Sequence, residues 1–235
     1  MDATGVASLF RGLTTAHVAD ACLRTKVDVR CAPCDLRALR PSDVVVGRVR
    51  PARHYGSVDI FLEALEEGSP GEVLVVDNAG RRDEACVGDL IVLEAKLAGL
   101  AGMVVWGLHR DTQELFEIGL PVFSLGEYPT GPLRLDPRDA HALASARVGS
   151  WTVGADDVAM GDADGVVFLP AARAEEIAEA ARAIRDTERA QAEKMRHGTS
   201  LRRQVRFSDF LARRAADPAL TLREHLRRIG GAIEE

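Results

Sequence analysis

Several features that this chain of 235 residues lacks limit what it can do. No run of about 18 apolar residues occurs, which excludes an ordinary membrane-spanning helix. The first residues show no basic region followed by an apolar stretch and a small-residue cleavage site, so we expect a cytoplasmic protein without a secretory signal. Aromatic residues make up only 5% of the chain, which argues against a surface that stacks nucleic-acid bases.

Cysteine is also scarce, with four in the chain. Cys31 and Cys34 form a CxxC motif, which can be a redox pair or half of a zinc site. A zinc site needs two more ligands, and the other cysteines, Cys22 and Cys86, are isolated. The motif also lacks the strand-then-helix context of a thioredoxin-like pair. We therefore predict reduced thiols, with a functional role as the weaker alternative.

The net charge of −6 is distributed unevenly. Residues 171–235 hold 14 basic and 11 acidic residues, whereas the first 170 hold 16 and 25. The charges of the tail alternate in sign, as on a solvated helix face with ion pairs. With the acidic body and the missing apolar run, this pattern predicts neither nucleic acid nor a membrane as a partner.

Hydrophobic periodicity and turn residues predict alternating helices and strands, which is typical of an α/β fold. Two apolar runs, 72–77 and 102–106, read as buried strands, and the first of them reads as buried on both faces. Residues 26–41 and 128–137 read as irregular segments, Thr14 or Thr15 as a helix cap, and Thr221 as the cap of the last helix. We expect helices at 6–24 (in two pieces), 57–67, 89–100, 111–118, 139–146, 171–195, 208–215 and 221–229, and strands at 43–50, 72–77, 102–106, 121–125, 147–153 and 166–170.

The stretch that organises the chain begins with Gly88, Asp89, Leu90 and Ile91. Asp89 and Leu90 fall in the first turn of the predicted helix, whose free amides carry partial positive charge. Gly88 would let a ligand approach these amides, so the segment can bind a carboxylate. The alternative, that Asp89 merely caps the helix, is equally well supported by the spacing.

Arg110 and Asp111 follow the buried strand 102–106, and twenty residues, 90–109, separate them from Asp89. Adjacent opposite charges at a strand end are often only a surface pair. In the functional interpretation, Arg110 grips a carboxylate with its planar fork of donors, and Asp111 binds a hard cation. One carboxylate is enough, because Mg²⁺ keeps several waters and takes further ligands from the substrate.

The acidic turn at 160–165 resembles a Ca²⁺ loop only superficially. It lacks a later bidentate Glu, and a strand follows it in place of a helix. We predict a hairpin or bulge turn there.

Together, the segment Gly88–Ile91, the twenty-residue gap, Arg110, Asp111 and Glu114 resemble the signature of the RraA-like family. Further similar stretches are 70–77, 119–123 and 161–167, and the resemblance runs from about Thr14 to Pro170. The tail, with the segment 221–227 and the Gly-Gly-Ala-Ile-Glu-Glu end, looks like the extension of some longer members. The family includes class II pyruvate aldolases that cleave 4-hydroxy-4-methyl-2-oxoglutarate and 4-carboxy-4-hydroxy-2-oxoadipate.

The resemblance implies a compact α/β sandwich of the RraA or phosphohistidine-domain-like type, with residues 1–170 as the catalytic core and 171–235 as a C-terminal helical extension. It implies a homotrimer or homohexamer with active sites between subunits, where a neighbour adds an acidic group that the sequence does not identify. By the same resemblance, Asp111 is the ligand of Mg²⁺ or Mn²⁺ and Arg110 contacts the substrate. The backbone of Gly88–Ile91 cradles the substrate carboxylate, and Asp89 orients a metal-linked water. Glu114 completes the motif without an assigned role.

The implied activity is retro-aldol cleavage of a 4-hydroxy-2-oxo acid to pyruvate and a carbonyl product, with oxaloacetate decarboxylation as a related reaction. No lysine Schiff base is required, and the only lysine near the motif is Lys96, inside the helix. Two alternatives remain: a non-catalytic regulator that restrains an RNA-degrading endonuclease, and a silent oligomeric scaffold. His109 and Trp106 depart from the family pattern; we predict that both pack at the strand end, the other interpretation being that they reshape the pocket.

Overall fold

The computed structural model describes residues 3–230, and the chain-end residues 231–235 lie outside the described part. Within it, an eight-stranded mixed sheet has the strand order β1-β12-β11-β3-β4-β6-β8-β2. Its strands are β1 (Arg30–Cys31), β2 (Arg37–Ala38), β3 (Val45–Arg53), β4 (Val73–Asp77), β6 (Gly102–Trp106), β8 (Val122–Ser124), β11 (Asp157–Asp162) and β12 (Gly165–Pro170). Two small sheets pair β9 (Ser145–Val148) with β10 (Trp151–Gly154) and β5 (Ala85–Val87) with β7 (Leu108–His109).

The helices lie before, between and after these strands. They are α1 (Ala3–Leu9), α2 (Thr15–Arg24), α3 (Asp59–Glu66), α4 (Asp89–Leu97), α5 (Thr112–Ile118), the 3₁₀ turn η1 (Ala171–Arg173), α6 (Ala174–Arg196), α7 (Leu201–Gln204), α8 (Phe207–Ala216) and α9 (Leu222–Ile229). Thr14 caps α2 and Thr221 caps α9, each in a capping box, as the sequence predicts. None of the helices described here combines the length and the apolar character that crossing a bilayer requires.

The centre of the sheet is parallel, and its edges are antiparallel. β3, β4, β6 and β8 run in the same direction, whereas β11 pairs antiparallel with β3, and β12 with β11. The sheet curls until its two halves face each other, and Arg37 Nη1, on the edge strand β2, donates to the carbonyl of Asp164 in the β11–β12 turn at 3.1 Å. That turn confirms the hairpin predicted at 160–165.

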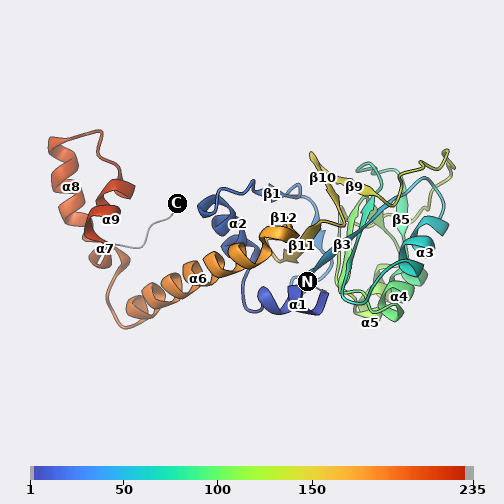
Figure 1. The fold of residues 1–235 in the computed structure, drawn as a ribbon, viewed down its shortest axis with the longest axis horizontal. Helices are drawn as coiled ribbons and strands as arrows, with labels where there is room; N and C mark the ends of the chain where they lie inside the picture. Colours follow the sequence, from blue (N-terminus) through green and yellow to red (C-terminus); the bar gives the residue numbers. More distant parts are fainter. Residues whose placement is uncertain (1–2, 231–235) are drawn as a thin grey trace.

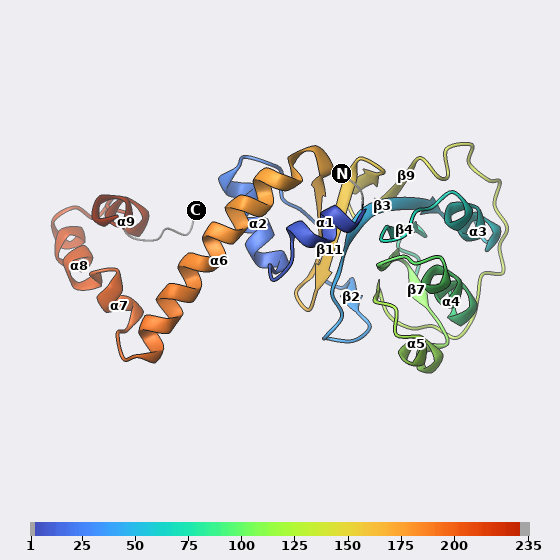
Figure 2. The ribbon, with the colours of Figure 1, turned by 60° about the horizontal axis from the view of Figure 1, so that its bottom comes forward.

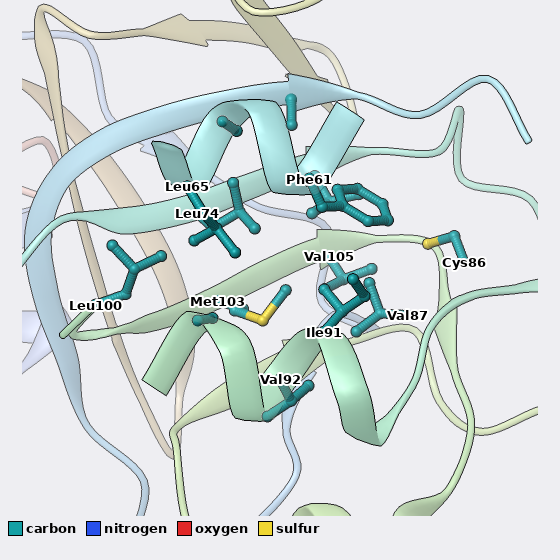
Figure 3. Close-up of a cluster of buried hydrophobic side chains, with 14 of the residues drawn as sticks. Phe61, Leu65, Leu74, Cys86, Val87, Ile91, Val92, Leu100, Met103 and Val105 are labelled. Carbon is teal, nitrogen blue, oxygen red and sulfur yellow. The ribbon is translucent and has the colours of Figure 1, made fainter. Parts of the chain in front are cut away.

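Three clusters of buried side chains follow from this curl. One fills the inside of the sheet, with Phe123 and Phe168 from its two halves. A second lies between α3, α4 and the outer face of β4 and β6, and it includes Phe61 and Met103 (Figure 3). A third lies between α1, α2, α6 and the outer face of β11 and β12. The result is the predicted α/β sandwich, in which helices cover both outer faces.

β4 shows why its sequence is apolar throughout. Leu74 and Val76 belong to the cluster under α3 and α4, whereas Val73 and Val75 point into the sheet interior. Because side chains alternate across a strand, only a strand covered on both faces buries all four. The prediction of a strand buried on both faces is confirmed, and the same holds for Met103, Val104 and Val105 of β6.

The C-terminal helices extend away from the sandwich (Figures 1 and 2). The buried residues of α6 are Ala174, Ile177, Ala178, Ala181 and Ile184, all in its first half. Its second half is charged and projects outward to α7, α8 and α9, which gather around Phe210 and Leu226. The helix therefore joins the sandwich to a small helical tail.

Several sequence-based predictions of local structure are wrong. Residues 139–146 form turns up to Ala144, in place of a helix, and Asp139 Oδ1 accepts from the amide of His141 at 2.8 Å. The predicted strand 147–153 is the β9–β10 hairpin, because Gly149 adopts a φ of +61° and reverses the chain. The periodicity also missed β11, the short helix α7, and the two-residue strands β1 and β2 within 26–41.

Candidate functional site

Two short parallel strands bring the organising stretch together. β5 and β7 continue beyond the carboxyl ends of β4 and β6, and Val87 pairs with His109. The amide of Arg110 donates to the carbonyl of Val87 at 2.9 Å. Gly88 follows β5 and Arg110 follows β7, so the two residues lie side by side at the same edge of the sheet. Ligands bind at this edge in open α/β sheets.

Gly88 occupies a position without room for a side chain. A Cβ built there would lie 2.4 Å from Asp111 Oδ2 and 3.2 Å from Arg110 Nε. Its φ of −136° and ψ of −171° are open to any residue. The requirement for glycine is therefore purely steric, and it comes from the carboxylate and the guanidinium that converge on it.

The first turn of α4 faces the same point. The amide of Asp89 donates to Asp111 Oδ2 at 3.3 Å, and the amide of Leu90 donates to Asp89 Oδ1 at 2.8 Å. Gly88, as the N-cap, has no side chain to accept from the amide of Ile91. Two carboxylates thus already sit at the helix start, which shows that these amides attract anions. Asp89 is the first residue of α4, Gly88 is the N-cap, and no side chain makes a cap hydrogen bond, so the alternative that Asp89 merely caps the helix is wrong.

Asp111 is held in an unusual backbone conformation. It precedes α5 with φ +58° and ψ +41°, in the left-handed region that non-glycine residues rarely occupy. Such a residue costs of the order of 1 kcal/mol and persists where the surroundings impose it. The conformation turns its carboxylate toward Gly88 and the start of α4, and its side chain stays one-third exposed.

Arg110 lies across the site beside this carboxylate. Its Nε is 3.3 Å from Asp111 Oδ2, and its side chain is 48% exposed, so the guanidinium is free to meet a ligand. A Cβ at Gly131 would lie 3.1 Å from Arg110 Nη1. Gly131 thus leaves space for the end of the arginine, a contact that no local pattern in the sequence predicts.

His109 and Trp106 pack beneath the site. His109 is 2% exposed, and its ring nitrogens lie 2.8 Å from Ser124 Oγ and 3.1 Å from Thr112 Oγ1. Burial lowers the pKa of His109, so the ring is neutral near pH 7. Trp106 packs against the sheet interior and under Gly80. The predicted packing role is confirmed for both residues.

Other residues singled out in the sequence lie around or away from the site. Ile91 is buried in the cluster under α4, whereas Leu90 is 74% exposed. Glu114 is exposed on α5. Lys96 Nζ donates to the carbonyl of Ile118, at the far end of both helices, so the expectation that lysine takes no part agrees with its position.

The remaining motifs have structural explanations. Cys31 and Cys34 are free thiols, and burial raises the pKa of Cys31, so it is no activated thiolate. Asp162, in the acidic turn, accepts from the amide and the hydroxyl of Thr15 at 2.8 Å and 2.7 Å. It therefore holds the start of α2 and does not form a Ca²⁺ loop.

The donor set suits a weakly held hard cation. Among residues 3–230, no group of three or more His, Cys, Asp or Glu side chains could hold a metal ion. The site itself offers oxygen from Asp111 and Asp89 only. Mg²⁺ and Mn²⁺ accept one or two protein carboxylates and complete their shell with water and substrate, whereas zinc sites need three or four protein ligands.

The curled mixed sheet, with carboxylates, an arginine and a helix start at its carboxyl edge, defines the class of the protein as an α/β sandwich. A family model described as RraA-like, Aldolase/RraA, matches residues 15–168. The match covers more than half of the chain, and the protein belongs to the RraA-like family.

Among the individual relatives, one is named as an aldolase and another as a member of an RNase inhibitor family. A Halalkalibacterium halodurans protein named "Putative 4-hydroxy-4-methyl-2-oxoglutarate aldolase" is 30% identical over 148 residues, which are 63% of this chain and 70% of that protein. An uncharacterized protein from Pseudomonas syringae pv. tomato str. DC3000 is 25% identical, with a TM-score of 0.75 over 85% of this chain and 96% of that one. Streptomyces coelicolor RraAS2, described as an unusual member of the RNase ES inhibitor RraA protein family, is 25% identical, with a TM-score of 0.67 over 82% and 98%.

Proposed function

We propose that the protein is a divalent-metal-dependent class II aldolase, a lyase that cleaves a 4-hydroxy-2-oxo acid to pyruvate and a carbonyl product. One observation carries the proposal: Asp111 Oδ2 lies 3.3 Å from both Arg110 Nε and the amide of Asp89, around a glycine that admits no side chain. The name of the Halalkalibacterium relative supports the same chemistry.

The cation would be held by Asp111 directly and by Asp89 through water. When bound, Mg²⁺ or Mn²⁺ supplies Lewis-acid stabilisation of the negative charge that develops on the 2-oxo group. In the structure, Asp111 instead accepts from the amide of Asp89 at 3.3 Å, a bond long enough to be given up cheaply. Its release would free that amide for the substrate.

The substrate carboxylate would then lie at the start of α4. The free amides and the helix dipole stabilise an anion there, and the exposed fork of Arg110 adds charge-assisted hydrogen bonds. This orientation points the 2-oxo group toward the carboxylate of Asp111. The same residues would recognise pyruvate, the product common to all substrates of this class.

Cleavage breaks the bond between C3 and C4 of the substrate. The C4 hydroxyl gives its proton, through the water held by Asp89, to the Asp89 carboxylate and becomes a carbonyl, and the electron pair of the broken bond forms the enolate of pyruvate. Arg110 stabilises the enolate charge, and water held by Asp89 gives its proton to C3. Oxaloacetate would lose CO₂ to give the same enolate, so decarboxylation would be a second activity of this site.

We place the complete site between subunits of a homotrimer or homohexamer. On the chain itself the site is open, with Arg110 half exposed and Asp111 one-third exposed. Closing such a site against water would strengthen its electrostatic interactions. A neighbouring subunit would supply the cover together with a further acidic group.

The test is exchange of the pyruvate methyl protons in deuterated water, with Mg²⁺ and then with a chelator. We expect metal-dependent exchange in the wild-type protein and none in Asp111→Ala. Arg110→Lys should raise the pyruvate KM, because one ammonium cannot reproduce the fork. Full exchange in the presence of chelator, or in Asp111→Ala, would contradict the assignment.

The alternative function is regulation of an RNA-degrading endonuclease by protein contact, which the likeness to Streptomyces coelicolor RraAS2 supports. A regulator needs an exposed binding face but no cation at Asp111. Absence of metal-dependent exchange, together with binding of an endonuclease, would favour it over the aldolase.

A further inference from the structure

A polar cavity of about 420 Å³ opens at the carboxyl ends of β3 and β4. This volume is ordinary for a small-molecule site. We call it the arginine cavity because four arginines line it beside two aspartates and one histidine. Its lining consists of Arg53, His54, Asp77, Ala79, Arg81, Arg134, Asp136, Arg147 and Thr152.

Not all of this positive charge is neutralised within the protein. Arg134 pairs with Glu84 at 2.8 Å and with Asp136, and Arg53 pairs with Asp139. The guanidinium of Arg147, in contrast, has no hydrogen bond or ion pair to any residue of the described part of the chain. Arg81 pairs with Asp83 at 2.7 Å through Nη2, but its Nε is buried without a hydrogen bond, 3.6 Å from Glu84 Oε1. Two guanidinium groups thus retain donors for an anion.

The fold fixes Arg147 at the cavity. Asp77, at the end of β4, is 6% exposed and accepts from the amide of Arg147 at 3.0 Å through Oδ2. Its Oδ1 accepts from the amide of Ala79 at 2.9 Å. Asp77 therefore binds β9 to the end of β4 through the backbone, and the side chain of Arg147 is left for other partners.

His54 adds an acceptor to these donors. Its Nδ1 lies 2.9 Å from Asn78 Oδ1, which also accepts from Arg134 Nη2 at 2.8 Å. Because that oxygen only accepts, Nδ1 must carry the proton, and Nε2 presents a lone pair. Nε2 is buried without a partner. Burial lowers the pKa of His54, which keeps the ring neutral, and the ring is held by stacking on Phe61.

We propose that the arginine cavity binds a small hydroxy acid, whose carboxylate pairs with Arg147 and Arg81 and whose hydroxyl donates to Nε2 of His54. A ligand with an oxyanion alone would leave the histidine lone pair without a donor, which costs binding energy in a buried position. The chemistry of the two unsatisfied groups therefore selects for an anion that also carries a hydroxyl.

This cavity is separate from the site at Gly88. Glu84 pairs with Arg134 at the cavity, and four residues later along β5 the chain reaches Gly88. The residues of that site, Gly88, Asp89, Arg110 and Asp111, do not line the arginine cavity. We therefore assign the arginine cavity a ligand of its own, a second molecule beside the substrate.

The test compares L-malate with succinate, which differ only by one hydroxyl, by calorimetry on the full chain carrying Asp111→Asn to disable the proposed cation site. We expect malate to bind at least tenfold more tightly than succinate. Arg147→Gln should weaken both about tenfold, since it removes a charge-assisted hydrogen bond. Arg196→Gln, an exposed arginine on α6, is the matched control and should change neither.

His54→Phe keeps the stacking partner but removes the lone pair, and it should lower malate affinity to that of succinate. Arg147 is exposed on β9, so its variant tests the proposal even where His54→Phe folds poorly. Equal binding of malate and succinate, unchanged affinity in Arg147→Gln, or no binding of either acid at millimolar concentration would each overturn the proposal.

Discussion

Replacing Gly88 by alanine should separate folding from activity. The added Cβ would lie 2.4 Å from Asp111 Oδ2, so that oxygen must move by about 1 Å to reach van der Waals distance. The backbone of Gly88 suits alanine, and the displaced atom ends a short, partly exposed side chain. The Asp111 side chain can therefore move away from the new Cβ at little energetic cost, and the free energy of unfolding should change by less than about 1 kcal/mol. A misplacement of about 1 Å at a catalytic group costs roughly 100-fold in rate.

The assay pairs urea unfolding with pyruvate proton exchange in the presence of Mg²⁺. Gly154→Ala is the control, because its Cβ would meet the carbonyl oxygen of Ala144 at 3.1 Å, far from the site in the sequence and on another hairpin. The control should keep full exchange, whereas Gly88→Ala should lose most of it. Normal exchange in well-folded Gly88→Ala would refute the claim that the position of the Asp111 carboxylate matters.

Three further predictions follow from the same structure. Asp111→Gly should abolish exchange yet unfold at no lower urea concentration than Asp111→Ala, because only glycine adopts the left-handed backbone there without strain; a less stable glycine variant would contradict this. Burial lowers the pKa of His109 below its ordinary value of 6.5, so the folded protein favours the neutral ring. The free energy of unfolding should therefore decrease as the pH falls below about 6.5, where the unfolded chain takes up the proton more readily. In His109→Gln, the urea midpoint should decline less between about pH 7 and 5. A chain ending at residue 185 should keep the thermal midpoint of the full chain, because the last buried residue of α6 is Ile184. Among the described residues, the ion pairs that the retained part of the chain loses are His17–Glu188 and Arg185–Asp186, each with an exposed carboxylate. A large drop in the midpoint would show that the tail stabilises the sandwich.

Much of the fold could be predicted because its strands and helices are long and periodic. The run Val73–Asp77 is apolar at every position, which only a doubly covered strand explains, and the hairpin at 160–165 follows from its turn residues. The alternation of residues 147–153 predicts one strand, whereas the chain reverses at Gly149 and forms a hairpin there. Residues 139–146 are good helix formers that tertiary contacts hold as turns, for example through the bond from the amide of Arg53 to the carbonyl of Ala142.

The candidate site was only partly accessible to such reasoning. That a helix start at Asp89 and a strand end at Arg110 converge follows from the helix–strand order, since parallel strands place their carboxyl ends at one edge. The strands that align them, β5 and β7, have three and two residues, too few for a period. The left-handed conformation of Asp111 and the space at Gly131 arise from tertiary contacts. The roles assigned to these residues stay predictions.

The outer half of α6 is a helical spacer between the sandwich and the tail. From Arg185 to Arg196 it rises about 1.5 Å per residue, so it holds the small tail about 18 Å from the sandwich and in one direction. Each residue also turns the helix by about 100°. One inserted residue would rotate the tail about the helix axis by about 100°, to another side of the molecule. Seven inserted residues would return the tail to within about 20° of its present orientation and place it farther from the sandwich. The length of α6 therefore determines both the distance of the tail from the sandwich and the direction in which the tail faces.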